Sequence, residues 1–397
     1  MIRTISGYDK SPSTTRILYI TSREDEIRRL FDTIRPRVAC VTVIGMTEDY
    51  NVLSYSSREG LTKVSRFQMP IMPIMGHLIR GLALIVFQLT IVWRSIVSRS
   101  MVNDVTICTS AIHVFLLTPF HRLGAIRKLV FYVGDYFPQS EKMGPIARIK
   151  HRLYQKMDGM AWEEADAVWC YTHAIRNRIA TEMPLRSKFV KFVPPLYFPA
   201  GDLPPDLKDP TIVYVGGLRK GAGIELTLDA LKQLPSGLQI PKLELFGLES
   251  EHDVLANLRR HAAELNLEEK LIIRGHVSIT ELQKSLQKAL CGLAIFPAGN
   301  ADYSNYAYPN KVKTYVENGI VPIIGFSSAL NEHSEFRDFA LFVEETPEGV
   351  SQAISLLVRN PELAQRMGAA AFAYGQREHN HPAIFREIES VLAEQGI

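Results

Sequence analysis

Glycines and cationic side chains follow the first strand expected in the second half of this 397-residue chain. The segment from Val213 to Gly223 reads VYVGGLRKGAG and leads into an expected helix. Glycines let a backbone approach a ligand closely, and the start of a helix offers free N–H groups to an anion. A diphosphate site is therefore expected here, although a structural turn with solvated cations fits the same residues. The spacing differs from the GxGxxG dinucleotide fingerprint.

A second segment combines tyrosines with a lysine at the start of another expected helix. From Ala301 to Tyr315 it reads ADYSNYAYPNKVKTY. Pro309 and Asn310 suit a helix start, which places Lys311 in the first turn, where a cation opposes the helix dipole. An anion beside Lys311 would explain that placement, and an ordinary solvent-facing lysine is the alternative.

Two weaker signals lie at the ends of other expected strands. Gly247 indicates a tight turn, which needs no ligand. His276 and Val277 follow a strand, where the backbone of Val277 is well placed to meet a flat base, whereas a lone histidine is more often structural.

These segments lie between alternating strand-like and helix-like runs, the pattern of βαβ units around a mostly parallel sheet. In the first half, strands are expected at 16–22, 38–44, 104–109, 129–133 and 165–171, with helices at 23–34 and 146–164. In the second half, strands are expected at 211–215, 242–246, 271–274, 292–296, 321–325 and 340–343. Helices are expected there at 225–233, 254–265, 280–289, 311–318 and 349–358, and helices continue after Pro361.

Six prolines between 194 and 210 indicate a linker between two domains. Ligands of doubly wound sheets bind beyond the carboxyl ends of the strands. The cleft between the two domains is therefore the expected binding site.

Charge is divided unevenly along the chain. Residues 1–200 contain 27 Lys/Arg and 16 Asp/Glu, which gives +11, and the remainder contains 18 and 26, which gives −8. A basic half favours anionic lipid, nucleic acid or a phosphorylated substrate. We expect no nucleic-acid partner, because no RNA-binding strand motif and no cationic run interleaved with aromatics is present.

The run 71–97 is mostly apolar, and its core of thirteen residues lies between Arg80 and Arg94. That core would span about 20 Å as a helix, short of the roughly 30 Å of bilayer hydrocarbon. Either a helix buried in the first domain or a helix in the membrane interface, with Trp93 at the boundary, fits the run. Residues 1–16 are polar and unlike a signal peptide, and the four cysteines are scattered without CxxC pairs, which favours the cytoplasm.

The second half resembles the nucleotide-binding domain of GT-B glycosyltransferases, in particular the large retaining family four, also called glycosyl transferases group 1. Members carry a glycine turn with Arg or Lys, an FG turn, a GxV loop and a segment of the form PxKxxxYxxxGxPV. The matching residues here are Pro309, Lys311, Tyr315, Gly319 and the near match Val321-Pro322. In the first half, YVGDYFP from Tyr132 to Pro138 is similar to a YxxDYxP segment in a subset of the family. The resemblance covers nearly the full chain and is strongest over 211–325.

The resemblance implies an α/β GT-B architecture, in which two doubly wound parallel-sheet domains face each other across a cleft. Residues 1–200 would bind the acceptor, residues 201–380 would bind the nucleotide-sugar, and 381–397 would form a helix that crosses back to the first domain. The implied reaction transfers a sugar from a UDP- or GDP-sugar to a hydroxyl, with retention at the anomeric carbon. No metal and no other cofactor is implied.

The resemblance also implies roles for individual residues. Lys311 and Arg219 would stabilise charge on the departing diphosphate. Asp135 either orients or deprotonates the acceptor hydroxyl or caps a turn, and the loop tyrosines pack either on the ligand or within the protein. The residues expected to contact the nucleotide-sugar are Gly216, Gly217, Arg219, Lys220, Gly247, His276, Val277, Tyr303, Tyr306, Tyr308, Pro309, Asn310, Lys311 and Thr314.

Two departures from the family pattern stand out. Many relatives carry two glutamates eight positions apart around this segment, where this chain has Tyr306 and Thr314. The lysine that usually precedes Gly223 is replaced by Ala222, with Lys220 two positions earlier.

The acceptor is expected to be a carbohydrate or a lipid-linked molecule, because the first half is basic and carries the apolar run 71–97. This favours bacterial polysaccharide or glycolipid assembly at the inner face of the plasma membrane, with a peripheral membrane contact. A nucleotide-sugar epimerase of the same architecture and a catalytically silent nucleotide-binding protein are the alternatives.

Overall fold

The computed structural model describes most of the two sheets and their helices. The described residues are 13–21, 38–46, 52–58, 61–67, 103–136, 144–183, 190–193, 210–286, 288–296, 305–326, 328–378, 387, 389, 390 and 393. The expected helix 23–34, the run 71–97, most of the linker and Tyr303 lie outside them.

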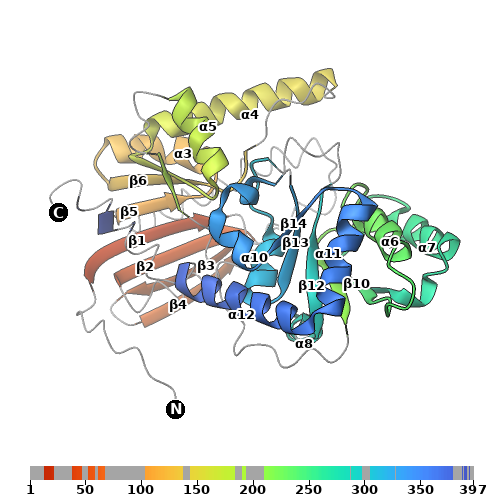
Figure 1. The fold of residues 1–397 in the computed structure, drawn as a ribbon. Coiled ribbons are helices and arrows are strands. Elements are labelled where there is room, and N and C mark those ends of the chain that lie inside the picture. Colours follow the sequence, from red (N-terminus) through yellow and green to blue (C-terminus); the bar gives the residue numbers. More distant parts are fainter. Residues whose placement is uncertain are drawn as a thin grey trace, which may run out of the picture.

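The first sheet has strand order β4-β3-β2-β1-β5-β6-β7-β8 (Figure 1). Its strands are β1 Ser13–Thr21, β2 Val38–Met46, β3 Val52–Arg58, β4 Leu61–Phe67, β5 Asn103–Cys108, β6 Ile126–Val133, β7 Ala167–Cys170 and β8 Val190–Phe192. The described helices of this half are α3 Ala111–Arg122, α4 Pro145–Glu164 and α5 His173–Glu182. The strands β2, β1, β5, β6, β7 and β8 pair in parallel in this order, as expected. At the β2 edge, β3 and β4 extend the sheet as an antiparallel hairpin that the strand pattern did not predict.

The second sheet is parallel throughout, with order β11-β10-β9-β12-β13-β14. Its strands are β9 Thr211–Val215, β10 Lys242–Phe246, β11 Leu271–Gly275, β12 Ala289–Ala294, β13 Val321–Gly325 and β14 Leu341–Val343. The helices are α6 Ile224–Lys232, α7 Val254–Glu264, α8 Ile279–Leu286, α10 Asn310–Glu317, α11 Pro347–Arg359 and α12 Pro361–Glu378, with short 3₁₀ turns η4 Glu268–Lys270, η5 Ala329–Glu332 and η6 Ser334–Asp338. The strand order reverses between β9 and β12, which makes their carboxyl ends the ligand position of such a sheet.

Two hydrophobic clusters cover the two faces of this second sheet. Figure 1 shows α6, α7 and α11 on one side and α10 and α12 on the other. The cluster that contains α10 also includes buried residues of β5, β6 and β7, so the two halves of the chain pack against each other.

The position of β12 corrects one expectation. We expected a strand at 292–296, but it begins at Ala289 and ends at Ala294. The preceding helix ends at Leu286 rather than Ala289. The physical reason is burial, since all six residues of β12 are buried and extended, and the chain leaves the sheet at Ile295.

Two histidines meet where the halves of the chain touch. His173 begins α5, His333 lies between η5 and η6, and their ring centroids are 4.7 Å apart. The ring of Phe192 lies 4.1 Å from His173 and 5.2 Å from His333. Burial, and then the charge of His173, lowers the pKa of His333 from 6.5 to about 4. Burial also lowers the pKa of His173. The contact therefore favours neutral rings.

This contact predicts a loss of stability in mild acid. Between pH 6.5 and 4 the unfolded chain binds a proton that folded His333 does not, so its contribution is complete above pH 6.5 and is lost as the pH falls towards 4. The shift corresponds to roughly 3 kcal/mol. We expect the unfolding midpoint of the natural protein to fall more steeply between pH 6.5 and 5 than that of His333→Phe, which keeps a ring but cannot titrate. Equal slopes in thermal denaturation would show that the histidine pair does not control this behaviour.

Candidate functional site

Two glycine turns stack at the carboxyl ends of β9 and β10. The N–H of Gly216 donates to the carbonyl of Phe246 at 2.8 Å, and the N–H of Gly247 donates to the carbonyl of Gly275 at 2.8 Å. Gly216 has φ of 138° and Gly247 has φ of 144°, values that L side chains rarely adopt. A Cβ at Gly247 would overlap the carbonyl oxygen of Gly216. The FG turn therefore has a structural use, because it lets the two turns pack directly on each other.

Lys311 lies against the first of these turns. Pro309 precedes α10, and Lys311 is the second residue of the helix, as the sequence predicted within one residue. Its Nζ lies 3.8 Å from the ring centroid of Tyr214 and 5.1 Å from that of Phe296. A Cβ at Gly216 would lie 3.8 Å from Cε of Lys311. The ammonium group is thus held over aromatic rings, which favours a cation, at the turn where a diphosphate was expected.

Burial and a neighbouring cation disfavour the charge of Lys311. Burial, and then the charge of Arg219, lowers the pKa of the Lys311 ammonium from 10.5 to about 7. Arg219 itself is exposed. An anion beside Lys311 would offset the repulsion from Arg219 and would compensate the ammonium group for its burial. The pair is therefore suited to bind a phosphate group, and the same group would stabilise the charged form of Lys311.

Tyr315 fixes α10 to the sheet below this site. Its hydroxyl accepts a hydrogen bond from the N–H of Val215 at 3.2 Å and lies 3.0 Å from the carbonyl of Leu293. Gly292 leaves room for the ring, because a Cβ there would lie 2.5 Å from a ring carbon of Tyr315. Sequence reasoning noted Tyr315 only as part of a motif and missed its partner. A glycine inside a buried strand was the available signal for a close approach.

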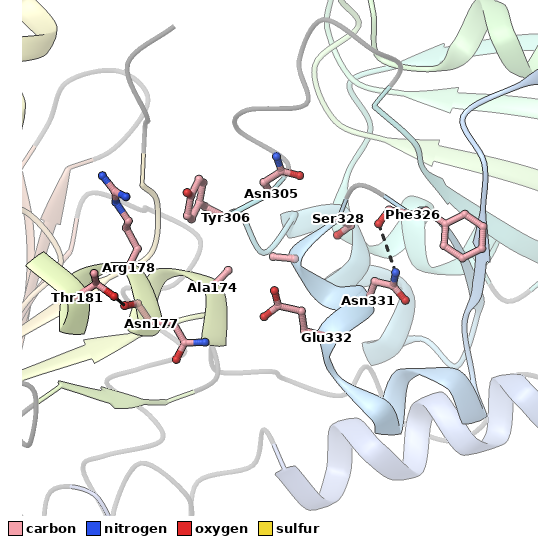
Figure 2. Close-up of a pocket in the computed structure, with 11 residues that line it drawn as sticks. Ala174, Asn177, Arg178, Thr181, Asn305, Tyr306, Phe326, Ser328, Asn331 and Glu332 are labelled. Carbon is pink, nitrogen blue, oxygen red and sulfur yellow. Dashed lines mark hydrogen bonds between the residues drawn. The ribbon is translucent and has the colours of Figure 1, made fainter.

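A pocket of roughly 550 Å³ opens between the two halves of the chain, beside Tyr306. Figure 2 shows side chains of α5 on one wall and side chains of the segment after β13 on the other, with Asn305 and Tyr306 between them. The lining is mostly polar and consists of Ala174, Asn177, Arg178, Thr181, Asn305, Tyr306, Phe326, Ser328, Ala329, Asn331 and Glu332. Apart from Tyr306, none of these residues was a sequence candidate, since their proximity depends on contacts between distant segments.

Solved structures share this architecture over nearly the whole chain. Sucrose-phosphate synthase from Thermosynechococcus elongatus is 15% identical with a TM-score of 0.67, and the match covers 96% of this chain and 99% of that one. Anabaena HepE in complex with UDP is 12% identical with a TM-score of 0.65, covering 96% and 100%. The catalytic domain of starch synthase IV from Arabidopsis thaliana, bound to ADP and acarbose, is 11% identical with a TM-score of 0.65, covering 96% and 99%. At these identities the likeness establishes the fold.

The sequence itself supplies the family. Residues 201–374 match the family described as glycosyl transferases group 1. The second half of the chain is therefore a glycosyl transferases group 1 domain, within a chain that has the GT-B fold. No curated protein matches its sequence.

Other predicted donor contacts of the glycosyltransferase lie in the three turns that follow β9, β10 and β11. Arg219 and Lys220 are exposed, and the backbone N–H of Lys220 donates to Glu251 at 3.4 Å. His276 is exposed, while Val277 packs partly against the hydrophobic core. All three turns lie at the carboxyl ends of neighbouring strands, so the structure brings these residues to one edge of the sheet.

Tyr306 and Tyr308 occupy different surroundings, although they are two positions apart. Tyr308 is 5% exposed and packs edge-on against Phe336 inside the domain. The ring of Tyr306 instead lies 4.8 Å from that of Tyr136, and its carbonyl accepts a hydrogen bond from the hydroxyl of Thr172 at 2.8 Å. Tyr306 thus joins the segment before α10 to the first half of the chain.

Thr314 and Asn310 lie along the partly exposed side of α10. The hydroxyl of Thr314 donates to the carbonyl of Asn310 at 3.2 Å, which is a bond within the helix. This hydroxyl stands where many relatives carry the second glutamate. Both positions at which many relatives carry glutamate, Tyr306 and Thr314, therefore have defined partners in the protein.

Asp135 lies at the end of β6 and is partly exposed. Burial is the largest cause of the raised pKa of Tyr154, and the charges of Asp158 on α4 and of Asp135 raise it further. Burial raises the pKa of Asp158 from 3.8 to about 7, against the hydrogen bond from Tyr154. Two carboxylates and a phenol thus lie close together in the first half of the chain.

Proposed function

We propose that this glycosyltransferase moves a sugar from a nucleoside diphosphate sugar to an acceptor hydroxyl, with retention at the anomeric carbon and without a required metal. The observation that carries the proposal is the placement of Lys311 over Tyr214, beside Gly216 and the charge of Arg219. Two cations at one glycine turn repel each other, and a diphosphate would neutralise both.

The leaving diphosphate gains negative charge as the bond to the sugar breaks. In the proposed mechanism, Lys311, Arg219 and the backbone N–H groups of the Gly216 turn stabilise that charge, and they are already in place before the reaction begins. The cation–ring contact with Tyr214 holds the ammonium group there. We assign Lys311 and Arg219 as catalytic residues on this basis.

The acceptor is proposed to enter from the first half of the chain. Residues 1–200 would form the acceptor domain and residues 201–380 the donor domain. The pocket between α5 and the segment after β13 would receive the transferred sugar and the acceptor, and its polar lining suits hydroxyl groups. Asp135 would orient or deprotonate the attacking hydroxyl.

The C-terminal residues 381–397 are proposed to return to the first domain. Two contacts support this. The ammonium of Lys191 on β8 lies 3.0 Å from the hydroxyl of Ser390 and 3.9 Å from a carboxylate oxygen of Glu387.

The donor is proposed to carry UDP or GDP, and the structurally similar HepE, solved with UDP and with UDP-glucose, favours UDP. We further propose a place in bacterial polysaccharide or glycolipid assembly, with a carbohydrate or lipid-linked acceptor at the cytoplasmic face of the membrane. The excess of cationic residues in 1–200 supports this setting. Among the described residues, no helix is long and apolar enough to cross a bilayer, and the run 71–97 lies outside them.

Titration with nucleotide-sugars tests the donor assignment. A ligand at a hundred times its dissociation constant stabilises the folded state by about 2.7 kcal/mol, which corresponds to a rise in melting temperature of roughly 5–10 °C for a domain of this size. Of the four classes UDP-, GDP-, ADP- and dTDP-sugars, we expect only one to give that response, and UDP-sugars are the expected class. The same titration on Lys311→Met is the control, because that variant keeps the stem over Tyr214 and lacks the charge.

Absence of stabilisation by all four classes would contradict the proposed function. Donor turnover without any acceptor separates a transferase from an epimerase of the same architecture. An epimerase consumes or interconverts its nucleotide-sugar when no acceptor is present.

A further inference from the structure

Helix α4 exposes a continuous row of apolar side chains to solvent. Ile146, Ile149 and Leu153 are 72%, 65% and 64% exposed, and Met160 on the same side is 39% exposed. Their spacing of three, four and seven residues places them on one side of an α-helix. We call this row the α4 stripe.

The α4 stripe is separate from the side of the helix that builds the core. His151, Asp158, Ala161 and Trp162 are buried, and α4 packs against α3 and β6. In Figure 1, one end of α4 projects beyond α3 and α5. The first three turns carry most of the exposed positions, so this end is the N-terminal one. The stripe is therefore an apolar surface that the described fold leaves uncovered.

Cationic side chains accompany the stripe. Between Pro145 and Met157 the helix contains Arg148, Lys150, Arg152 and Lys156 and no aspartate or glutamate. Arg148, Arg152 and Lys156 are exposed. Tyr154, 40% exposed, lies at the border between the stripe and the core side. Apolar side chains flanked by cations on one amphipathic helix match the chemistry of an anionic lipid surface.

We propose that the α4 stripe binds the surface of an anionic membrane, with the helix lying parallel to the bilayer. Ile146, Ile149 and Leu153 would enter the boundary between headgroups and acyl chains, and the neighbouring cations would contact phosphate groups. A second protein would have to offer an apolar groove lined by carboxylates. An anionic bilayer instead supplies apolar acyl chains and anionic headgroups along the whole helix. The residues of this stripe belong to a different segment of the sequence from the run 71–97.

The position of α4 gives this contact a use, in a step that rests on the proposed function. Tyr154 lies on the same helix. Burial, and then the charges of Asp158 and of Asp135, the proposed acceptor base, raise the pKa of Tyr154. A membrane held at the α4 stripe would therefore present a lipid-linked acceptor close to Asp135. Membrane binding itself needs no donor and no turnover, so it is tested separately.

Vesicle flotation with the full-length protein tests the proposal. We expect binding to vesicles that contain 30 mol% phosphatidylglycerol in phosphatidylcholine and much weaker binding to phosphatidylcholine alone. The double variant Ile149→Gln with Leu153→Gln should require at least about ten times more lipid for half-maximal binding, since two apolar side chains no longer enter the interface. Arg152→Gln with Lys156→Gln should reduce the preference for the anionic vesicles and the sensitivity to salt.

Matched controls lie in the second half of the chain. Leu356→Gln replaces an apolar side chain that is 41% exposed on α11, and Lys284→Gln with Lys288→Gln removes two exposed cations near α8. These variants should bind vesicles as the natural protein does. Equal binding by the stripe variant, or no binding of the natural protein to anionic vesicles, would overturn the proposal.

Light scattering tests the remaining alternative, in which a second copy of the protein covers the α4 stripe. If the natural protein is a dimer that the stripe variant converts to a monomer, and no vesicle binding occurs, the stripe is an interface between copies and the membrane proposal is wrong. Donor binding by thermal shift should be unchanged in every stripe variant. If the natural protein itself bound no nucleotide-sugar, that result would instead contradict the proposed transferase function.

Discussion

Replacement of Lys311 by alanine is expected to lower kcat/KM by about a hundredfold or more, because one preorganised donor to a developing anion contributes that much to catalysis. The effect should appear in both donor binding and turnover, since the ammonium group beside Gly216 would contact the diphosphate before and during transfer. Kinetics with a radiolabelled nucleotide-sugar and isothermal titration with the nucleoside diphosphate measure the two parts separately.

The control variants separate charge from packing. Lys311→Met keeps an apolar stem over Tyr214 and should lose activity like alanine while the protein stays at least as stable, because burial disfavours the charged lysine. Lys220→Ala removes an exposed cation three positions after Gly217 and should have a smaller effect. If Lys311→Met retained full turnover, the site assignment would be wrong even though the fold stands.

Replacement of Gly292 by alanine is expected to destabilise the protein by about 3 kcal/mol and to displace α10. The added methyl group would lie 2.5 Å from the ring of Tyr315, and that ring has no free space because its hydroxyl is held between Val215 and Leu293. Since α10 carries Lys311, donor affinity should fall together with stability. Chemical denaturation and donor titration measure both quantities on one preparation.

A second glycine provides the control for this experiment. Gly159 lies inside α4, and a Cβ added there meets nothing within 4 Å. Gly159→Ala should therefore leave stability unchanged or raise it by up to about 1 kcal/mol. A similar loss in both variants would indicate a general cost of removing glycine. A neutral Gly292→Ala would show that Tyr315 does not depend on the space that Gly292 leaves.

The second sheet could be predicted closely because each of its strands is an apolar run bounded by glycine or polar turns. Five of its six strands begin within one residue of expectation, and only β12 is displaced, by three residues at its start. The hairpin of β3 and β4 was missed because its strands, VLSYSSR and LTKVSRF, show neither a regular polar–apolar alternation nor a long apolar run. An edge hairpin needs no such run, since its outer strand pairs on one side only.

The candidate site was predicted where it depends on local sequence and missed where it depends on distant contacts. Lys311 at a helix start and Gly216 at a strand end each follow from their neighbours in the chain. That the two meet depends on the register between β9 and β12. The pocket between Asn177 and Arg178 on one wall and Glu332 on the other depends on the packing of the two halves. Such contacts leave no trace in the spacing of residues.

The hydrogen bond from Thr172 to the carbonyl of Tyr306 has a consequence for the end of the catalytic cycle. Only Ala307 and Tyr308, both buried, separate Tyr306 from Pro309 at the start of α10. A rotation that parts the two domains must either break this bond or pull on the segment that places Lys311. Under the proposed mechanism, separation of the domains would therefore be coupled to departure of the spent nucleotide, because the movement would disturb the segment that places Lys311.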